Sequence, residues 1–271
     1  MTDPSPLWTP PEELIERATM TRYMLWLESE RDLHFDDYHA LWRWSTDDLE
    51  GFWSSIWDFF EVASPTPYDQ VLADPTMPDA RWFSGAHVNY AEQVFRDKPG
   101  DAIAMIAESE VRERREVSWG ALRGEVAALA AGLKALGVER GDRVVAYIPN
   151  VPEAIAAFLA VASLGAVWSS CSPDFGARSV VDRFAQIEPK VLLAVDGYGY
   201  NGKSYDRMES VAGLQDEIPS LVKTVILPYV DDSPDLGRLR GDAMTWAELL
   251  ELGGDAGGEI DFEAVPFDHP L

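Results

Sequence analysis

The sequence has few residues that could form a disulfide, a metal centre or a basic surface. It contains one cysteine and four histidines in 271 residues, and 22 Lys and Arg residues stand against 47 Asp and Glu residues. A single cysteine excludes an intrachain disulfide and a CxxC metal framework, and the histidines show no metal-ligand spacing. The net charge of −25 argues against binding to nucleic acid or an anionic membrane, because both would be repelled.

Long apolar runs are also missing. The longest uncharged apolar stretch extends from Ala154 to Trp168 and is interrupted by Gly165, and it falls short of the ~20 residues that a membrane span requires. The first residues, MTDPSPLWTPPEEL, lack the basic region and apolar core of a signal peptide. We therefore expect a cytoplasmic protein.

Residues 1–95 are rich in tryptophan and predict a helical extension. Seven of the ten tryptophans lie there, and we expect them to pack in a core. Residues 9–12 resemble a capping box with Pro10 at the first helical position, which predicts a helix through Leu27. Apolar residues at helical spacing predict a second helix over 46–62.

Strands and helices alternate after about residue 101. Runs of β-branched and apolar residues predict five strands, over 102–107, 143–148, 165–170, 190–196 and 223–227. Helical periodicity predicts helices between them, over 118–136, 152–162, 176–187 and 205–217, and one more in the acidic tail, over 245–252. This alternation indicates an α/β fold, with a mostly parallel sheet flanked by helices.

Residues 197–204 fit the phosphate-loop pattern G-x-x-x-x-G-K-[ST] between a predicted strand and a predicted helix. Tyr198 and Tyr200 are bulky for a loop that must wrap around phosphates, and the segment would follow about the fourth strand rather than the first. Three interpretations stay open: a P-loop NTPase site, a Gly-rich turn, and a helix start where Lys203 and backbone N–H groups hold a phosphate of another ligand.

Three groups of segments resemble the adenylate-forming acyl-CoA synthetase family. They are 38–53 with 80–92, 117–122 with 137–145, and 151–154 with 164–176. Within them, Ser169-Ser-Cys-Ser-Pro-Asp-Phe175 and Asn89-Tyr-Ala-Glu92 look more like the acetoacetate-activating branch than the acetate-activating one. The order and spacing of the motifs carry the resemblance over nearly the whole chain.

The resemblance implies a division of the chain. Residues 1–95 would form the N-terminal acyl-CoA synthetase extension, and 96–271 the N-terminal portion of the large AMP-binding (adenylation) domain. The family's ATP phosphate loop, of the form S-G-T-T-G-x-P-K, would follow Leu271. We therefore expect a fragment that ends before the ATP site, contains no catalytic residue and is inactive alone.

The resemblance also implies acetoacetate–CoA ligase chemistry, with ATP, CoA and Mg²⁺, and acetoacetate as the small-molecule substrate. Lys203, with Tyr200 and Gly202 beside it, would contact a CoA phosphate, and Phe175 and Gly176 would lie near the pantetheine arm. The alternatives are a P-loop NTPase that uses Gly197–Ser204 and a noncatalytic CoA- or partner-binding module.

Two further expectations concern surfaces. Later segments of the family's large domain would cover strand residues such as Val144, Ile148, Val167 and Val225, so the fragment would expose them and self-associate. The charged run 108–116, with four acids and three arginines, predicts a solvated hairpin. Cys171 is expected to be a small core residue.

Overall fold

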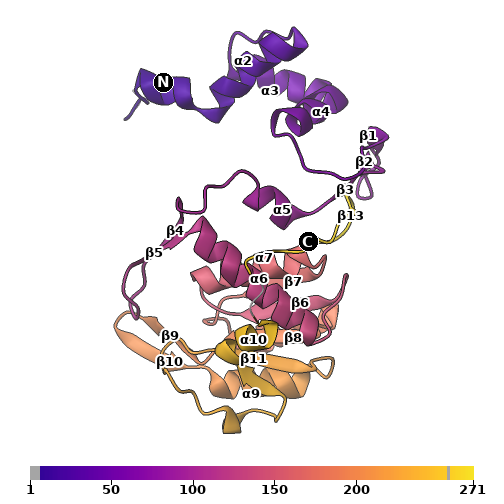
Figure 1. Ribbon diagram of the computed structural model, residues 1–271. Helices are drawn as coiled ribbons and strands as arrows, with labels where there is room; N and C mark the ends of the chain where they lie inside the picture. Colours follow the sequence, from indigo (N-terminus) through magenta and orange to yellow (C-terminus); the bar gives the residue numbers. More distant parts are fainter. Residues whose placement is uncertain (1–6, 255–256) are drawn as a thin grey trace, which may run out of the picture. The chain divides into compact units, whose positions relative to one another are not determined.

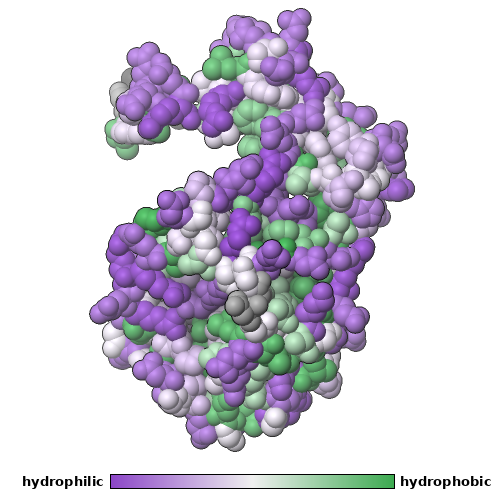
Figure 2. Space-filling view, in the orientation of Figure 1, coloured by the Kyte–Doolittle hydropathy of each residue, from purple (hydrophilic) through white to green (hydrophobic). Residues whose placement is uncertain are grey.

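The computed structural model describes residues 7–254 and 257–271, and it divides into two compact units, Met1–Ala86 and His87–Leu271 (Figure 1). The first six residues, part of the segment searched for a signal peptide, lie outside the described residues. Across 7–254 and 257–271, no helix combines the length and apolar character needed to cross a membrane. Hydrophilic residues predominate on the face seen in Figure 2, with hydrophobic ones among them.

The first unit consists mainly of helices packed through aromatic side chains. Its elements are α1 (Glu12–Arg17), α2 (Thr19–Arg31), α3 (Tyr38–Asp47), α4 (Leu49–Phe59) and the antiparallel pair β1 (Gln70–Asp74) and β2 (Arg81–Ser84). Trp26 and Trp44 pack on the buried Tyr23 and Leu27, and the Trp57 ring lies 4.6 Å from that of Phe83. The predicted tryptophan packing is thus confirmed for these three, whereas Trp8, Trp42 and Trp53 are exposed.

The helix boundaries of this unit differ from the sequence prediction. The capping box is wrong, because α1 begins after Pro11, which has no side chain able to cap, and the helix is interrupted at Ala18. The helix predicted over 46–62 is shorter as α4, whose N-terminus is capped by the Asp48 carboxylate on the Gly51 amide.

The second unit is built on a five-stranded parallel sheet in the order β7-β6-β8-β11-β12. Its strands are β6 (Arg143–Tyr147), β7 (Val167–Cys171), β8 (Val191–Val195), β11 (Lys223–Leu227) and β12 (Ala243–Thr245). The predicted parallel α/β sheet is therefore confirmed. One of the five predicted sheet strands is wrong. The segment 102–107 forms β4 (Ile103–Ala107), which pairs antiparallel with β5 (Arg115–Ser118) outside this sheet, and β12 is the fifth strand instead.

Helices cover both faces of this sheet. One face packs against α5 (Tyr90–Phe95), α6 (Trp119–Ala135), α7 (Pro152–Ser163) and α10 (Trp246–Gly253), and the other against α8 (Ala177–Phe184) and α9 (Met208–Glu217). Alternate residues of each strand point to opposite faces, so Leu193 belongs to the first core and Leu192 to the second. Ser118 caps α6 as predicted, and Gly137 follows that helix with φ of +83°.

Three of the four strand residues expected to be exposed are in fact buried. Val144 and Val225 are completely inaccessible, Ile148 is 5% exposed and Val167 is half-buried. The helices of the chain itself cover both faces of the sheet, so the expected exposure is wrong for Val144, Ile148 and Val225.

Residues from both ends of the second unit meet beside α7. The short strand β3 (His87–Val88) pairs antiparallel with β13 (Val265–Pro266). The buried side-chain amide of Asn89 donates hydrogen bonds to the main-chain oxygens of Ala162 and Glu263, each at 2.9 Å. Its Oδ1 accepts from the Ala91 amide, which caps α5. One side chain thus joins three segments distant in sequence.

Candidate functional site at the carboxyl edge of the sheet

The strand order of the sheet identifies where a ligand is expected. From β6 the chain passes to β7 on one side and then crosses to β8 on the other, so the direction of winding reverses between β6 and β8. In open parallel sheets, ligands bind outside the carboxyl ends of the strands at such a switch point. The segments that follow these strands are therefore the first candidates for a site.

The loop after β7 contains the predicted residues Phe175 and Gly176. The hydroxyl of the buried Tyr147, the last residue of β6, lies 2.7 Å from the main-chain oxygens of both Pro173 and Phe175. Burial raises the pKa of the Tyr147 hydroxyl, so it remains a donor at neutral pH. The Arg183 guanidinium lies over the Phe175 ring, 4.9 Å from its centroid. The loop is thus fixed from two sides.

The other predicted residues lie on a β-hairpin. β9 (Gly197–Tyr200) pairs antiparallel with β10 (Lys203–Asp206), and helix α9 begins only at Met208. The helix predicted from residue 205 is therefore wrong at its start, and Lys203 lies on a strand rather than at a helix N-terminus. A hairpin also lacks the strand–loop–helix geometry of a P-loop, so nothing here supports a P-loop NTPase.

The hairpin has a two-residue turn, Asn201-Gly202. Both residues have positive φ, +51° and +70°, which is the conformation of a type I′ turn. Tyr200 and Lys203 pair directly across this turn, and both side chains are exposed. The Asn-Gly dipeptide between two short β segments is the sequence signal that could have predicted the hairpin.

Arg207 connects the two sets of predicted residues. Its Nε donates to the Pro173 main-chain oxygen at 2.7 Å, and its Nη2 donates to the Tyr198 hydroxyl at 3.1 Å. The same guanidinium stacks on the Tyr198 ring, which stacks in turn on Tyr205. The structure therefore joins the loop of Phe175 and Gly176 to the hairpin of Tyr200, Gly202 and Lys203, through an arginine that the sequence prediction missed.

A pocket of about 580 Å³ opens beside Arg207, between the start of α8 and α9. Arg238 on its wall makes a bidentate ion pair with Asp206, at 2.6 and 3.1 Å. Hydrogen bonds from Arg238 hold the pKa of the Asp206 carboxyl below its ordinary value. The pocket therefore has both cationic and anionic groups on its wall, next to the loop after β7.

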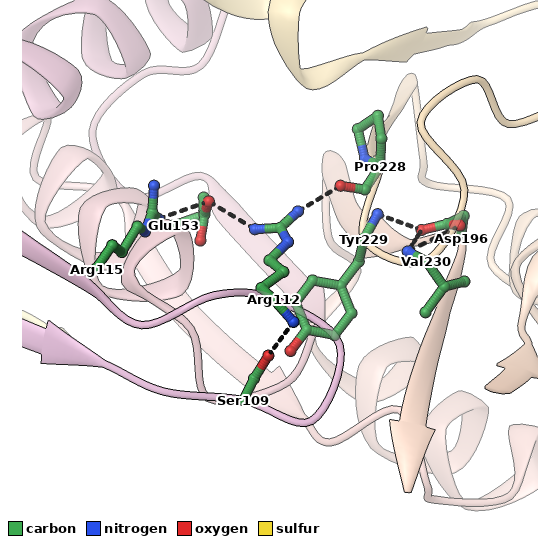
Figure 3. A network of polar contacts seen from close by, with 8 residues as sticks. All are labelled: Ser109, Arg112, Arg115, Glu153, Asp196, Pro228, Tyr229 and Val230. Carbon is green, nitrogen blue, oxygen red and sulfur yellow. Dashed lines mark hydrogen bonds and ion pairs between the residues drawn. The ribbon is translucent and has the colours of Figure 1, made fainter. Parts of the chain in front are cut away.

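A second polar network lies where the β4–β5 hairpin crosses the carboxyl edge (Figure 3). Glu153, in the first turn of α7, is 7% exposed, and its Oε1 accepts from Arg112 at 3.0 Å and Arg115 at 2.8 Å. Arg112 also donates to the Pro228 main-chain oxygen and stacks on the Tyr229 ring at 4.5 Å. The predicted solvated hairpin is thus confirmed, because residues 108–116 are exposed except for Arg112, which is half-buried.

Two pockets flank this network. The first, of about 260 Å³, is lined by Arg112, Arg115 and Tyr229 among others, and the second, of about 440 Å³, by Phe158, Trp168 and Cys171 among others. Asn150 and Ile155 line both. Cys171 is buried as predicted. Within the part of the chain that the structure describes, no cluster of three or more His, Cys, Asp or Glu residues could hold a metal ion.

The chain is similar to known protein families and to a solved structure. The family model described as AMP-binding enzyme matches residues 91–251, and the model described as acetyl-coenzyme A synthetase N-terminus matches residues 38–94. Among solved structures, the chain resembles acetoacetyl-CoA synthetase from Streptomyces lividans with a TM-score of 0.88 and 45% identity, over 98% of this chain and 40% of that one.

Curated relatives agree with the structural match. The acetoacetyl-coenzyme A synthetase of Rhizobium meliloti (strain 1021) is 39% identical over 266 residues, and that of Danio rerio is 38% identical over 273 residues. Each alignment includes 98% of this chain, which spans about 40% of the length of these relatives. The family match extends over more than half of the chain and includes the strands and helices that form the carboxyl edge, so the chain belongs to the AMP-binding enzyme family.

Proposed function

We propose that this chain is the N-terminal portion of an ATP-dependent acetoacetate–CoA ligase. Residues 1–95 would serve as its N-terminal extension and 96–271 as the first part of its adenylation domain. The observation that carries the proposal is the match over 98% of the chain to acetoacetyl-CoA synthetases, together with a TM-score of 0.88. The single cysteine and the absence of a membrane-spanning helix in the described residues support a cytoplasmic location.

The proposed reaction has two steps. An oxygen of the acetoacetate carboxylate attacks the α-phosphorus of ATP, and pyrophosphate leaves as acetoacetyl-adenylate forms. The CoA thiolate then attacks the acyl carbon, and AMP leaves as the thioester forms. Mg²⁺ would neutralise negative charge on the phosphates in the first step. The 271 residues contain no Ser/Thr/Gly-rich loop of the S-G-T-T-G-x-P-K type, so we expect no acyl-adenylate formation by this chain alone.

The contribution of this chain, in our proposal, is to bind the nucleotide end of CoA. Lys203 is exposed beside the turn of the β9–β10 hairpin, where its ammonium can reach a phosphate. Tyr200 is 65% exposed directly across from it and offers a ring for the adenine. Phe175 and Gly176 lie on the loop that Arg207 joins to this hairpin, a position suited to the pantetheine arm.

Titration of the chain with CoA tests this assignment. We expect Lys203→Ala to weaken CoA binding by about 10- to 100-fold, because a charge-assisted hydrogen bond to phosphate contributes about 1.5–3 kcal/mol. Lys134→Ala is the matched control. Lys134 is exposed in the last turn of α6, beside the amino ends of the strands and away from their carboxyl ends, where Lys203 lies. Equal affinities of the two variants would contradict the role of Lys203.

A further inference from the structure

We propose that the loop 108–116 is a positioning strap for the β9–β10 hairpin, anchored by Arg112 and acting on the hairpin through Glu110 and Val111. The proposal deepens the CoA site suggested above and rests on that assignment. It gives a function to the charged loop, which the sequence alone marks only as a solvated turn.

The anchor of the strap is Arg112. One guanidinium donates to the carboxylate of Glu153 at 3.0 Å and to the main-chain oxygen of Pro228, and it lies 4.5 Å from the ring centroid of Tyr229. In Figure 3 the side chain extends from the loop across the carboxyl edge, between α7 and the segment after β11. Arg112 therefore ties the loop to two separate elements of the second unit. The Ser109 hydroxyl also accepts from the Arg112 amide at 2.9 Å, which fixes the turn locally.

The surface that receives Arg112 is itself fixed. The carboxylate of Asp196, after β8, is 3% exposed and accepts hydrogen bonds from the amides of Tyr229, Val230 and Asp231 at 2.6–3.3 Å. These bonds hold the backbone that carries the Tyr229 ring (Figure 3). The anchor thus rests on a segment after β11 that Asp196 ties to the end of β8.

The far side of the strap contacts the hairpin near its turn. Glu110 accepts a hydrogen bond from the Gly202 amide at 2.9 Å. Val111 packs over Gly199 so closely that a Cβ there would lie 2.2 Å from Val111 Cγ1. A glycine at this position therefore allows the two loops to touch.

The hairpin needs such support. Among the described residues, β9 and β10 pair only with each other, and an isolated two-stranded hairpin is marginally stable in water. Arg207 fixes its base through Tyr198, whereas Glu110 and Val111 hold the end that carries Tyr200 and Lys203. The strap therefore determines how firmly the proposed phosphate contact is placed.

Hydrogen exchange of individual amides, followed by NMR on the whole chain, tests the strap without any ligand. Glu110→Ala should speed exchange of the Gly202 amide by about three- to tenfold, because that amide loses its acceptor. The Arg207 amide, which donates to the Asp196 main-chain oxygen at 2.7 Å at the hairpin base, should be unaffected. Glu110→Gln keeps an acceptor oxygen and should restore most of the protection.

Glu113→Ala is the matched control. Glu113 is exposed in the same loop and forms no hydrogen bond or ion pair among the described residues. Glu113→Ala changes the net charge by the same amount as Glu110→Ala and should leave exchange of the Gly202 amide unchanged. As a second variant, Gly199→Ala should push the strap away and speed exchange at Gly202, and adding Val111→Ala should reverse this effect by making room.

CoA titration of the same variants completes the test. Glu110→Ala should weaken CoA binding by about two- to fivefold relative to Glu113→Ala, less than the loss of Lys203 itself. Unchanged Gly202 exchange in Glu110→Ala, or faster exchange with unchanged CoA affinity, would overturn the positioning role. Failure of the CoA assignment is a separate result, recognised by a Lys203→Ala variant that binds CoA as well as the parent chain.

Discussion

Arg207 donates from its Nε to the main-chain oxygen of Pro173 at 2.7 Å, and this bond joins two segments that are more than 30 residues apart in sequence. The same side chain stacks on Tyr198 in the β9–β10 hairpin. A planar guanidinium can stack and donate in its own plane at once, which a lysine ammonium cannot do. Arg207 therefore links the loop after β7 to the hairpin, the two parts of the proposed CoA site.

This bridge predicts that Arg207→Lys weakens CoA binding even though the charge is kept. We expect the affinity for CoA, measured by titration, to fall about five- to tenfold, because one hydrogen bond and one stacking contact are lost. Arg178→Lys, at an exposed position on α8, is the matched control and should bind like the parent. Identical affinities of the two variants would show that the bridge does not shape the site.

Glu125, in α6, predicts a pH dependence of stability. Burial and, to a lesser extent, the nearby charge of Glu153 raise the pKa of the Glu125 carboxyl above its ordinary value of 4.5. A raised pKa means that the folded protein binds the proton more tightly than the unfolded chain does. The stability contributed by this group is thus fully present below pH 4.5 and is lost as the pH rises through the folded pKa.

The substitution Glu125→Gln removes the ionisable group and keeps an oxygen that can accept from Trp246. We expect it to raise the melting temperature at pH 7 and to change it little at pH 4, measured by thermal unfolding at both values. Glu251→Gln, at an exposed position on α10, should have no such pH-dependent effect. A Glu125→Gln variant less stable than the parent at pH 7 would contradict the predicted sign.

Asn89 predicts a large loss of stability upon truncation. Asn89→Ala removes the cap of α5 and the side-chain donor to the main-chain oxygens of Ala162 and Glu263, of which Ala162 keeps a bond from the Gly165 amide. We expect the free energy of unfolding to fall by about 2–4 kcal/mol, measured by urea denaturation. Ser118→Ala, which removes only the cap of α6, should lower it by about 1 kcal/mol. Equal losses would mean that the bridging bonds contribute nothing.

Much of the second unit could be predicted from the sequence because its strands and helices carry strong local signals. Val191–Val195 is apolar at every position, which is typical of a strand buried on both faces. Ser118 and Gly137 mark the two ends of α6 through a cap and a left-handed residue. These signals depend on a few neighbouring residues, so reading them requires no knowledge of tertiary contacts.

The strand predictions fail where strand pairing depends on residues distant in sequence. β4 has apolar residues like the sheet strands, but Ile103 and Ile106 are exposed and its partner is β5. β12 is only three residues long, Ala243–Thr245, and gains its place by pairing with β11. β10 is polar and exposed throughout, so its strand conformation comes from the Asn201-Gly202 turn rather than from a hydrophobic pattern.

The candidate site was harder to predict than the fold. Family resemblance points to Lys203 and Phe175, but Arg207 and Arg112, which fix the segments around them, carry no local sequence signal. An arginine in a charged run looks the same whether it lies in water or reaches a buried carboxylate such as Glu153. Only the three-dimensional arrangement of α7, β8 and β11 distinguishes the two cases.

The pairing of β3 with β13 has a consequence for how the second unit acquires its fold during synthesis. The strand His87–Val88 emerges from the ribosome among the first residues of this unit, yet its partner Val265–Pro266 is made only after the whole parallel sheet. The side chain of Asn89 must likewise wait for Glu263. The sheet from β6 to β12 can form as its strands appear. β3, by contrast, completes its contacts only after the chain between residues 88 and 265 has been made and its two ends come together. A nascent chain stalled before residue 263 should therefore leave the segment around β3 accessible to protease while the parallel sheet is already protected.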